Sequence, residues 1–197
     1  ASPDKVVMAG TGGESTYKTI ELTKKVADMG AKMVSLLMPH FFAKKIDDEV
    51  LKSFILEVAD ASPVPVVLYN NPSVAAGITI RADLLRAVSG HENVIGMKDS
   101  SRETYKENVE ARTDSFHIMS GSASYFLDLV RAGGIGGVLS LANIIPDACV
   151  ELHKLQLAGK AVEADELNER LVRLNKQVSG AYGVAGVKAA MDIAGFH

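Results

Sequence analysis

A lysine and a tyrosine each end a short apolar run, and this pair is the strongest chemical signal in the sequence. Tyr69 ends the run 64–69 and Lys98 ends the run 94–98. Apolar runs of this length, bounded by polar residues, are typical of buried strands. A lysine at such a strand end is partly removed from water, which disfavours the ammonium form and leaves an amine that can attack a ketone. Lys98 is therefore a candidate Schiff-base residue, although alone it fits a surface lysine just past a strand equally well.

Tyr69 would lie beside Lys98 if the two runs form neighbouring strands. A phenol next to a Schiff base can relay the protons that carbinolamine formation and carbon–carbon cleavage require. Taken alone, Tyr69 fits better as an amphipathic core aromatic whose hydroxyl bonds to backbone. Asp99 and Ser100 follow the lysine directly, and we expect them to hold the loop rather than to react.

Short apolar runs recur along the chain at intervals of 22 to 32 residues, and helical patterns separate most of them. Alternation of buried strand and helix predicts parallel βα units. The spacing fits a (β/α)8 barrel, which uses roughly 250 residues for eight units; a doubly wound sheet is the competing interpretation. The predicted strands are 6–9, 33–38, 64–69, 94–98, 116–119 and 137–141, and the predicted helices among them are 16–29, 47–60, 81–89, 123–132 and 146–158.

Six units cannot close an eight-stranded barrel, so the barrel interpretation implies that two units are missing. We expect residues 1–158 to form barrel units and residues 159–197 to form an incomplete helical extension, because 160–178 and 184–194 carry helical patterns without a strand. The chain starts without an initiator methionine and reaches a strand within a few residues. This abrupt start suggests that an N-terminal segment has been lost, which could include a targeting segment.

The composition and net charge argue against some classes of binding partner. The chain has 197 residues, of which 47% are apolar, and a formal net charge of -3. Without a block of basic residues, nucleic acid and acidic membranes are not expected partners, and no apolar run reaches the roughly 18 residues of a membrane span. Cys149 is the single cysteine, so no disulfide framework is expected, and its apolar helical surroundings predict a buried packing residue.

Two further features invite a functional interpretation that their spacing does not support. The five histidines show no metal-ligand spacing, so no metal site is predicted. The glycine-rich run 10–13 follows a strand and precedes a helix, but it lacks the glycine spacing and the lysine of a phosphate-binding loop. Ser15 or Thr16 is expected to cap the following helix instead.

A series of short motifs runs through the chain in a fixed order. They are Ala-Gly-Thr-Gly at 9–12, Val-Val-Leu-Tyr-Asn at 66–70, Gly-Met-Lys-Asp-Ser at 96–100, Ser-Gly at 120–121 and the stretch 136–143 from Gly-Gly-Val to Ala-Asn. In this arrangement the chain resembles the dihydrodipicolinate synthase / N-acetylneuraminate lyase family of class I pyruvate-dependent aldolases. The match covers nearly the whole chain, and the tyrosine and lysine motifs together make it specific.

The resemblance implies a (β/α)8 TIM barrel with a C-terminal helical extension, of which the first two βα units are missing from this chain. It implies that Lys98 forms the Schiff base with pyruvate or a similar 2-oxo acid, and that Tyr69 relays protons. Gly121 and the backbone around Leu139 would line the pyruvate pocket. It further implies a homotetramer or homodimer. The single cysteine favours a reducing compartment, and we expect the cytoplasm or the mitochondrial matrix. A family loop that binds the substrate carboxylate would fall outside this chain, which by itself should then be inactive.

Two departures from the synthases of this family bear on the substrate. Synthases place tyrosines after Pro39, whereas this chain has His40-Phe41-Phe42, and Phe41 has no hydroxyl with which to relay protons. Synthases also carry an arginine shortly after the tyrosine motif, and the stretch 73–77 has none. The lysine motif and the tail 183–194 resemble more closely the branch of 4-hydroxy-2-oxoglutarate aldolase and the 2-keto-3-deoxy sugar acid aldolases.

The sequence therefore predicts a class I aldolase that cleaves a 4-hydroxy-2-oxo acid to pyruvate and an aldehyde such as glyoxylate. No metal or cofactor is expected, because the protonated imine of Lys98 acts as the electron sink. The alternative within the family is dihydrodipicolinate synthase, which condenses pyruvate with aspartate semialdehyde. A second alternative is a barrel homologue that has lost the chemistry, which the retention of Lys98 and Tyr69 argues against.

Overall fold

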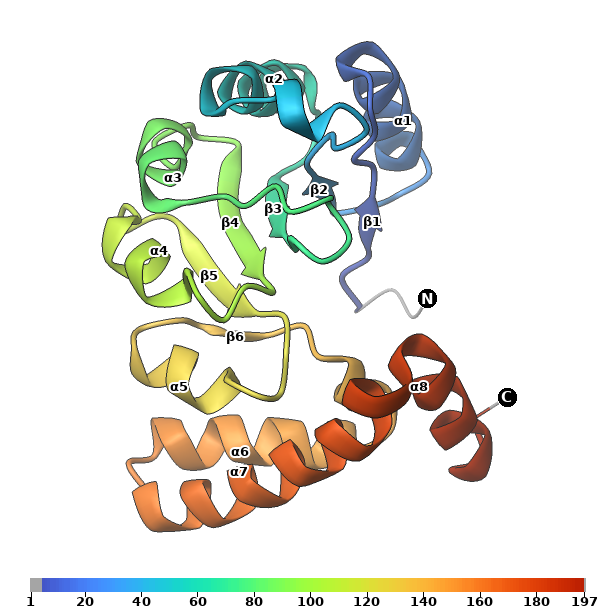
Figure 1. Ribbon diagram of the computed structural model, residues 1–197, viewed down its shortest axis with the longest axis vertical. Coiled ribbons are helices and arrows are strands. Elements are labelled where there is room, and N and C mark those ends of the chain that lie inside the picture. Colours follow the sequence, from blue (N-terminus) through green and yellow to red (C-terminus); the bar gives the residue numbers. More distant parts are fainter. Residues whose placement is uncertain (1–4, 197) are drawn as a thin grey trace. The chain divides into compact units, whose positions relative to one another are not determined.

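The computed structural model describes residues 5–196 (Figure 1). The chain forms two compact units, Ala1–Ile118 and Met119–His197. Each unit consists of parallel strands with helices between them, and the second unit continues into further helices. The division predicted at residue 158, between barrel units and helical extension, stays a prediction.

The first unit is a series of parallel βα repeats whose strands pair in sequence order: β1 with β2, β2 with β3, and β3 with β4. This order excludes the strand-order reversal of a doubly wound sheet among these strands. Figure 1 shows the helices on the outer side of the strands. The elements are β1 Met8–Gly10, α1 Thr16–Asp28, β2 Met33–Leu37, the 3-10 turn η1 Ala43–Lys45, α2 Asp48–Ala61, β3 Val66–Asn70, α3 Ala82–Val88, β4 Val94–Asp99, α4 Tyr105–Ala111 and β5 His117–Ser120, which reaches into the second unit.

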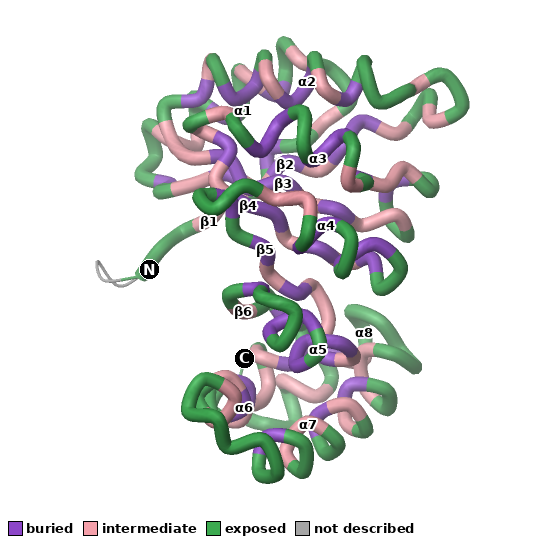
Figure 2. Tube along the Cα trace, turned by 90° about the vertical axis from the view of Figure 1, so that its left-hand side faces the viewer, coloured by how far each residue is buried: buried purple, intermediate pink, exposed green. Residues whose placement is uncertain are grey.

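Local sequence signals account for where these elements begin. The Ser15 side chain accepts a hydrogen bond from the Lys18 N–H, and Asp47 accepts one from Val50, so both cap a helix. The predicted cap at Ser15 is thus confirmed. The strands β2, β3 and β4 carry the buried core of this unit, which Figure 2 shows in purple. Fully buried members of the core include Val34, Leu36, Ile55, Val66, Leu68, Leu85, Met97 and Phe116.

The second unit begins with the end of β5, which pairs in parallel with the two-residue strand β6 Gly136–Gly137. The other elements are α5 Phe126–Arg131, the 3-10 turn η2 Ser140–Asn143, α6 Pro146–Leu157, α7 Ala161–Asn175, the π-helical turn η3 Lys176–Gly180 and α8 Ala181–Ile193. Cys149 is buried in the apolar cluster of this unit with Phe126, Leu127 and Leu152, as predicted.

Three differences from the predicted elements have physical reasons. The predicted strand 137–141 is wrong in extent, because η2 starts at Ser140 and ends the extended chain. Helix α4 was not predicted, because it has seven residues and an asparagine, Asn108, on its buried face. The predicted helix 160–178 gives way at Asn175 to the π-helical turn, and Gly183 (φ 58°, ψ -142°) then interrupts α8.

Candidate Schiff-base site

Lys98 and Tyr69 lie side by side at the carboxyl ends of β4 and β3. They are direct partners in the parallel register, and the Lys98 Nζ lies 4.3 Å from the centroid of the Tyr69 ring. Both side chains are half-buried. The face of an aromatic ring attracts a cation, so this arrangement favours any positive charge that forms at the nitrogen. An iminium made at Lys98 would carry such a charge at the same position.

The phenol oxygen of Tyr69 accepts a hydrogen bond from Asn71, two residues further along the chain. Asn71 Nδ2 donates a hydrogen bond of 2.8 Å to Tyr69 Oη, and Ser73 Oγ donates one of 2.6 Å to Asn71 Oδ1. Since Oη accepts the amide N–H, its own O–H remains available to donate. A donor directed at the phenol oxygen also stabilises negative charge that develops there when the phenol gives up its proton.

The next register pair, Asn70 and Asp99, points to the opposite face of the strands, because side chains alternate along a strand. Both residues are buried, and Asn70 Nδ2 donates a 3.0 Å hydrogen bond to Asp99 Oδ1. Asn108 Nδ2, from α4, donates to Asp99 Oδ2 at 3.0 Å. The Ser101 N–H donates to Asp99 Oδ1 at 2.8 Å. The carboxylate therefore ties the loop after β4 to β3 and α4, which agrees with the loop-holding role expected of Asp99.

The pKa of the buried Asp99 carboxyl is raised above its ordinary value. Burial raises the pKa of its carboxyl from 3.8 to about 6, although the hydrogen bonds from Asn108, Ser101 and Asn70 act in the opposite direction. Desolvation disfavours the charged form of a carboxyl group, and amide donors favour it. The direction of the shift shows that desolvation outweighs the three donors.

Two motif glycines allow backbones to approach closely around the site. A Cβ atom at Gly96, two residues before Lys98, would collide with the carbonyl oxygen of His117 on β5. A Cβ atom at Gly12 would collide with the backbone of Leu37, and Leu37 is the register partner of Tyr69. Both collisions are with backbone atoms, which cannot move aside as a flexible side chain can.

Gly121 and Leu139 belong to the second unit. Gly121 directly follows β5, and Leu139 is buried at the start of η2. The Val138 N–H donates to the Ser120 carbonyl at 2.8 Å, which extends the pairing of β5 and β6 by one step and places these two residues just beyond the strand ends. Their contribution to a pyruvate pocket stays a prediction.

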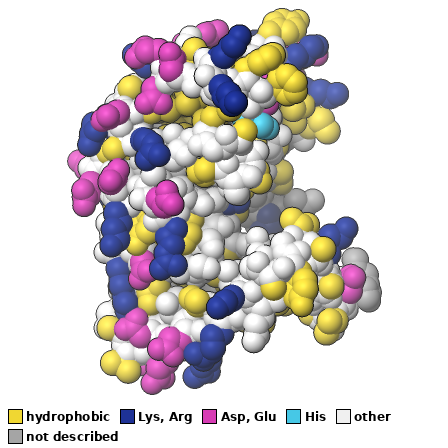
Figure 3. All heavy atoms as spheres, in the orientation of Figure 1, with side chains coloured by type: hydrophobic (Ala, Val, Ile, Leu, Met, Phe, Trp, Pro, Cys, Tyr) yellow, Lys and Arg dark blue, Asp and Glu magenta, His cyan; other side chains and the backbone are white. Residues whose placement is uncertain are grey.

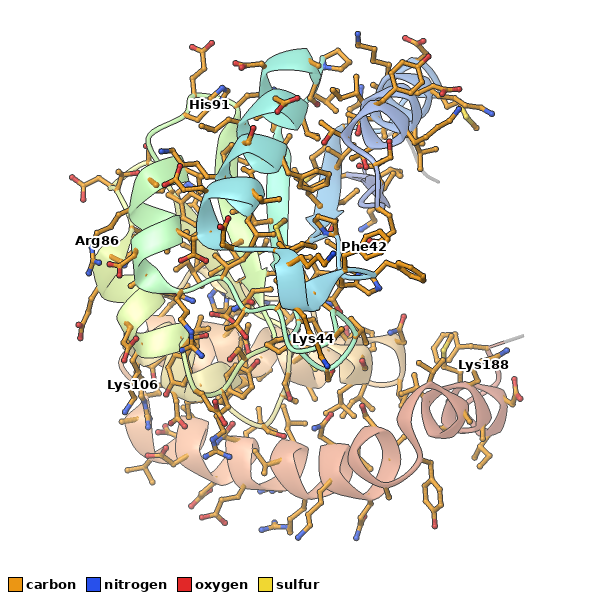
Figure 4. All side chains as sticks on the ribbon, turned by 45° about the horizontal axis from the view of Figure 1, so that its top comes forward. Phe42, Lys44, Arg86, His91, Lys106 and Lys188 are labelled. Atoms are coloured by element: carbon orange, nitrogen blue, oxygen red, sulfur yellow. The ribbon has the colours of Figure 1, made fainter. Side chains whose placement is uncertain are left out.

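The loop after β2 holds the sequence His40-Phe41-Phe42. The backbone N–H groups of His40 and Phe41 both donate to the Glu14 carboxylate at 2.9 Å, and this fixes the loop. The rings of Phe41 and Phe42 meet edge to face at 4.9 Å and are 76% and 65% exposed. Figure 4 labels Phe42 and Lys44 on this segment. As the sequence indicates, no hydroxyl stands at Phe41.

The described residues contain neither a metal cluster nor a membrane helix. Within 5–196, no group of three or more His, Cys, Asp or Glu side chains is placed to bind a metal ion. No helix in that part of the chain is long and apolar enough to span a bilayer. On the face drawn in Figure 3, acidic and basic side chains are interspersed, without a continuous basic area.

Comparison with known proteins identifies the family. The sequence model of the dihydrodipicolinate synthetase family matches residues 4–197. The chain belongs to this family. Over 189 residues it is 36% identical to the probable mitochondrial 4-hydroxy-2-oxoglutarate aldolase of Emericella nidulans, covering 94% of this chain and 60% of that family member. It is 31% identical over 196 residues to the L-threo-3-deoxy-hexylosonate aldolase of Hypocrea jecorina, covering 94% of this chain and 62% of the relative.

Among solved structures, the dihydrodipicolinate synthase of Acinetobacter baumannii complexed with pyruvate superimposes with a TM-score of 0.90 at 28% identity. The superposition covers 100% of this chain and 67% of that family member. The chain thus has the TIM-barrel type of fold of the family, with a helical C-terminal part. It spans about three fifths of the length of the two curated family members above.

The structure brings together the two predicted reactive residues and adds partners that sequence reasoning missed. Asn71 bonds to the phenol, and Asn70 and Asn108 bond to the carboxylate behind the pair. The dipeptide Asn70-Asn71 directly after Tyr69 was a signal available in the sequence. Nothing in the sequence pointed to Asn108, which contacts the strand ends only through the tertiary fold.

Proposed function

We propose that this protein is a class I aldolase that cleaves, or forms, a 4-hydroxy-2-oxo acid, with pyruvate or a similar 2-oxo acid as one product. The observation that carries the proposal is the position of the Lys98 amine over the Tyr69 ring, 4.3 Å from its centroid. A nucleophilic amine beside a phenol is the pair that Schiff-base formation and proton transfer need. The names of the aldolases from Emericella nidulans and Hypocrea jecorina support the same reaction class.

The two residues divide the reaction between them. The Lys98 amine attacks the C2 ketone, the Tyr69 phenol gives its proton to the departing hydroxyl group, and loss of water leaves an iminium above the ring and a phenolate at Tyr69. Tyr69 Oη, as phenolate, takes the proton from the C4 hydroxyl, the C3–C4 bond breaks, and its electron pair moves into the iminium to give an enamine. The aldehyde departs. The phenol then returns its proton to C3. Water hydrolyses the new iminium to release pyruvate and the free amine, and the proton set free by the hydrolysis restores the phenol. The hydrogen bond from Asn71 to Oη stabilises the phenolate that the bond cleavage requires.

The segment after the tyrosine motif supports aldol cleavage over condensation with aspartate semialdehyde. Residues 73–77 are Ser-Val-Ala-Ala-Gly and contain no guanidinium to hold a second substrate's carboxylate. We therefore favour the aldolase branch of the family over the synthase. Product screening separates the two, because a synthase consumes aspartate semialdehyde and an aldolase does not.

The remaining parts of the proposal concern the whole protein. We propose that the six strands correspond to the third to eighth strands of the family barrel, and that Gly121 and the backbone at Leu139 line the pyruvate pocket. A homotetramer or homodimer, in the cytoplasm or the mitochondrial matrix, completes the proposal. The word mitochondrial in the name of the Emericella nidulans relative supports one of these two compartments.

The test is reductive trapping. The full-length protein is incubated with pyruvate and borohydride, and the modified peptide is mapped by mass spectrometry. We expect one reduced adduct on the peptide that contains Lys98, its loss in Lys98→Ala and its retention in Lys106→Ala, which removes an exposed lysine of α4. Failure to trap pyruvate or any other 2-oxo acid on Lys98 would refute the aldolase proposal and favour the non-catalytic homologue.

A further inference from the structure

We propose that the buried cluster Asn70–Asp99–Asn108 is a positioning device that fixes Lys98 against Tyr69 for catalysis. The inference rests on the proposed function, because it assigns residues that act through the proposed reactive pair. None of the three touches substrate in this proposal. Asn70 and Asp99 lie on the opposite face of the same two strands, one residue beyond the reactive pair, and Asn108 contacts Asp99 from α4.

The strand register is what the cluster controls. Tyr69 pairs with Lys98, and Asn70 pairs with Asp99 one step further along. A slip of one residue would turn every side chain of one strand to the other face, and the amine would leave the ring. The hydrogen bond from Asn70 Nδ2 to Asp99 Oδ1, at 3.0 Å, joins the strands directly behind the pair and opposes such a slip.

The pairing of β3 and β4 is irregular near their amino ends, which explains why a side-chain contact is needed to fix the register at their carboxyl ends. Val66 pairs with Val94, but Val67 pairs with Gly96, so the register shifts by one residue between these two steps. Backbone pairing at the amino ends of β3 and β4 therefore does not by itself determine the register at their carboxyl ends. The side-chain hydrogen bond between Asn70 and Asp99 lies after the shift, where it can fix the register that the reactive pair needs.

The cluster also connects the strands to two outer segments. The Ile80 N–H donates to Asn70 Oδ1 at 2.9 Å, and Asn108 Nδ2 donates to the Ile80 carbonyl at 3.1 Å. Asn108 Nδ2 donates to Asp99 Oδ2 as well, at 3.0 Å. This amide nitrogen thus serves two acceptors, while its own buried oxygen has no hydrogen-bond partner among the described residues. The Asn108 side chain thus acts as a donor only, to the end of β4 at Asp99 and to the segment before α3 at Ile80.

A device of this kind acts on rate more than on binding. Reacting groups must be held in near-attack geometry, and a misplacement of about 1 Å can reduce the rate by about 10²-fold. Asp99→Asn tests the device with an almost identical shape. An NH2 group in place of Oδ2 faces Asn108 Nδ2 and loses one hydrogen bond, whereas an NH2 group in place of Oδ1 faces Asn70 Nδ2 and the Ser101 N–H and loses two.

The experiment compares Asp99→Asn and Asn108→Ala with the matched control Asn93→Ala. Asn93 precedes β4 at the other end of the strand, where its Nδ2 donates to the carbonyls of Ala59 and Ser62 at 2.9 Å. All proteins are assayed well below their melting temperatures. The assays measure kcat and KM for the cleavage of a 4-hydroxy-2-oxo acid, and the rate of borohydride trapping at Lys98. Thermal melting reports the loss of stability separately.

We expect kcat and the trapping rate to fall by about tenfold or more in both cluster variants, with KM changed by less than about threefold. Asn93→Ala should lose stability and keep kcat per folded molecule. The swap Asp99→Asn with Asn108→Asp returns a carboxylate to the cluster and should recover part of the lost kcat. If Asp99→Asn does not fold, the comparison of Asn108→Ala with Asn93→Ala tests the positioning role by itself.

Two results separate failure of this inference from failure of the proposed function. Cluster variants that keep wild-type kcat and trapping rate, in a protein that does form the Lys98 adduct, would overturn the positioning role alone. A wild-type protein that forms no adduct with any 2-oxo acid would overturn the aldolase proposal and this inference with it. A fall in kcat that merely follows the unfolded fraction, equally in Asn93→Ala, would show that the cluster is only structural.

Discussion

The buried carboxyl of Asp99 should make the stability of the protein fall with rising pH in a defined interval. Its pKa is about 6 in the folded protein, against 3.8 as the reference value. Between these two values the folded state holds the proton on Asp99 and the unfolded state has released it. The folded state therefore binds one proton more, and the free energy of unfolding decreases as pH rises through this interval.

The size of the effect follows from the width of the interval. One pH unit corresponds to about 1.4 kcal/mol for one proton, and the interval from 3.8 to about 6 spans about two units. Asp99 thus contributes about 3 kcal/mol of stability below pH 3.8 that is lost by the time the pH has passed about 6. A reference variant that cannot titrate at this position separates the contribution of Asp99 from other effects of pH.

Asp99→Asn supplies that reference, because it keeps the shape of the side chain and cannot titrate. Urea unfolding of both proteins from about pH 4 to about pH 8 gives the difference in unfolding free energy, in which the other carboxylates cancel. We expect wild type minus variant to decrease by about 3 kcal/mol as pH rises, with the steepest change between about pH 4 and about pH 6. A difference that is flat, or that increases with pH, would refute the reasoning, since it would mean that the amide donors outweigh desolvation.

Two further predictions concern the phenol and a backbone contact. Tyr69→Phe keeps the ring beneath Lys98 but removes the hydroxyl, so pyruvate should still be trapped at Lys98, more slowly and with protons from water, while aldol cleavage falls by about 10² to 10⁴-fold, the usual contribution of a general acid–base group; aldol cleavage at the wild-type rate would contradict the assignment. Gly12→Ala places a Cβ against the Leu37 backbone and should destabilise the protein by about 1–3 kcal/mol in thermal or urea unfolding. Gly10→Ala is the control, because nothing lies within 4 Å of its new Cβ, and similar losses in both variants would show that the collision is not responsible.

The parts of the fold that could be predicted are those in which apolar residues recur at a regular spacing. The buried strands appear as short apolar runs, and their spacing gives parallel neighbours in sequence order, so the contact of Tyr69 with Lys98 was foreseeable. The helices α1 and α2 were foreseeable for the same reason, since apolar stripes and the caps at Ser15 and Asp47 mark them. The helix signals depend on interactions between residues close in the chain.

The parts that were missed depend on tertiary contacts. Asn108 occupies a buried position of α4, where an apolar residue would have indicated an amphipathic helix. Its hydrogen-bond partners, Asp99 and Ile80, lie in other segments of the chain. The register shift between Val66 and Val67 had one weak signal, because Val67 pairs with Gly96 and a glycine within a strand often marks a bulge or a close approach of backbones. The short β6 was overestimated because an apolar run continues into η2, where the backbone turns instead of extending.

The alternation of faces at the ends of β3 and β4 separates two proposed roles. In the proposed reaction, Tyr69 and Lys98 act on the substrate, whereas Asn70 and Asp99 fix the register of the strands. Substitutions on the reactive face can therefore accumulate without disturbing the scaffold that aligns it. For enzyme engineering, libraries that vary the residues of the reactive face and its loops should therefore leave Asn70 and Asp99 unchanged.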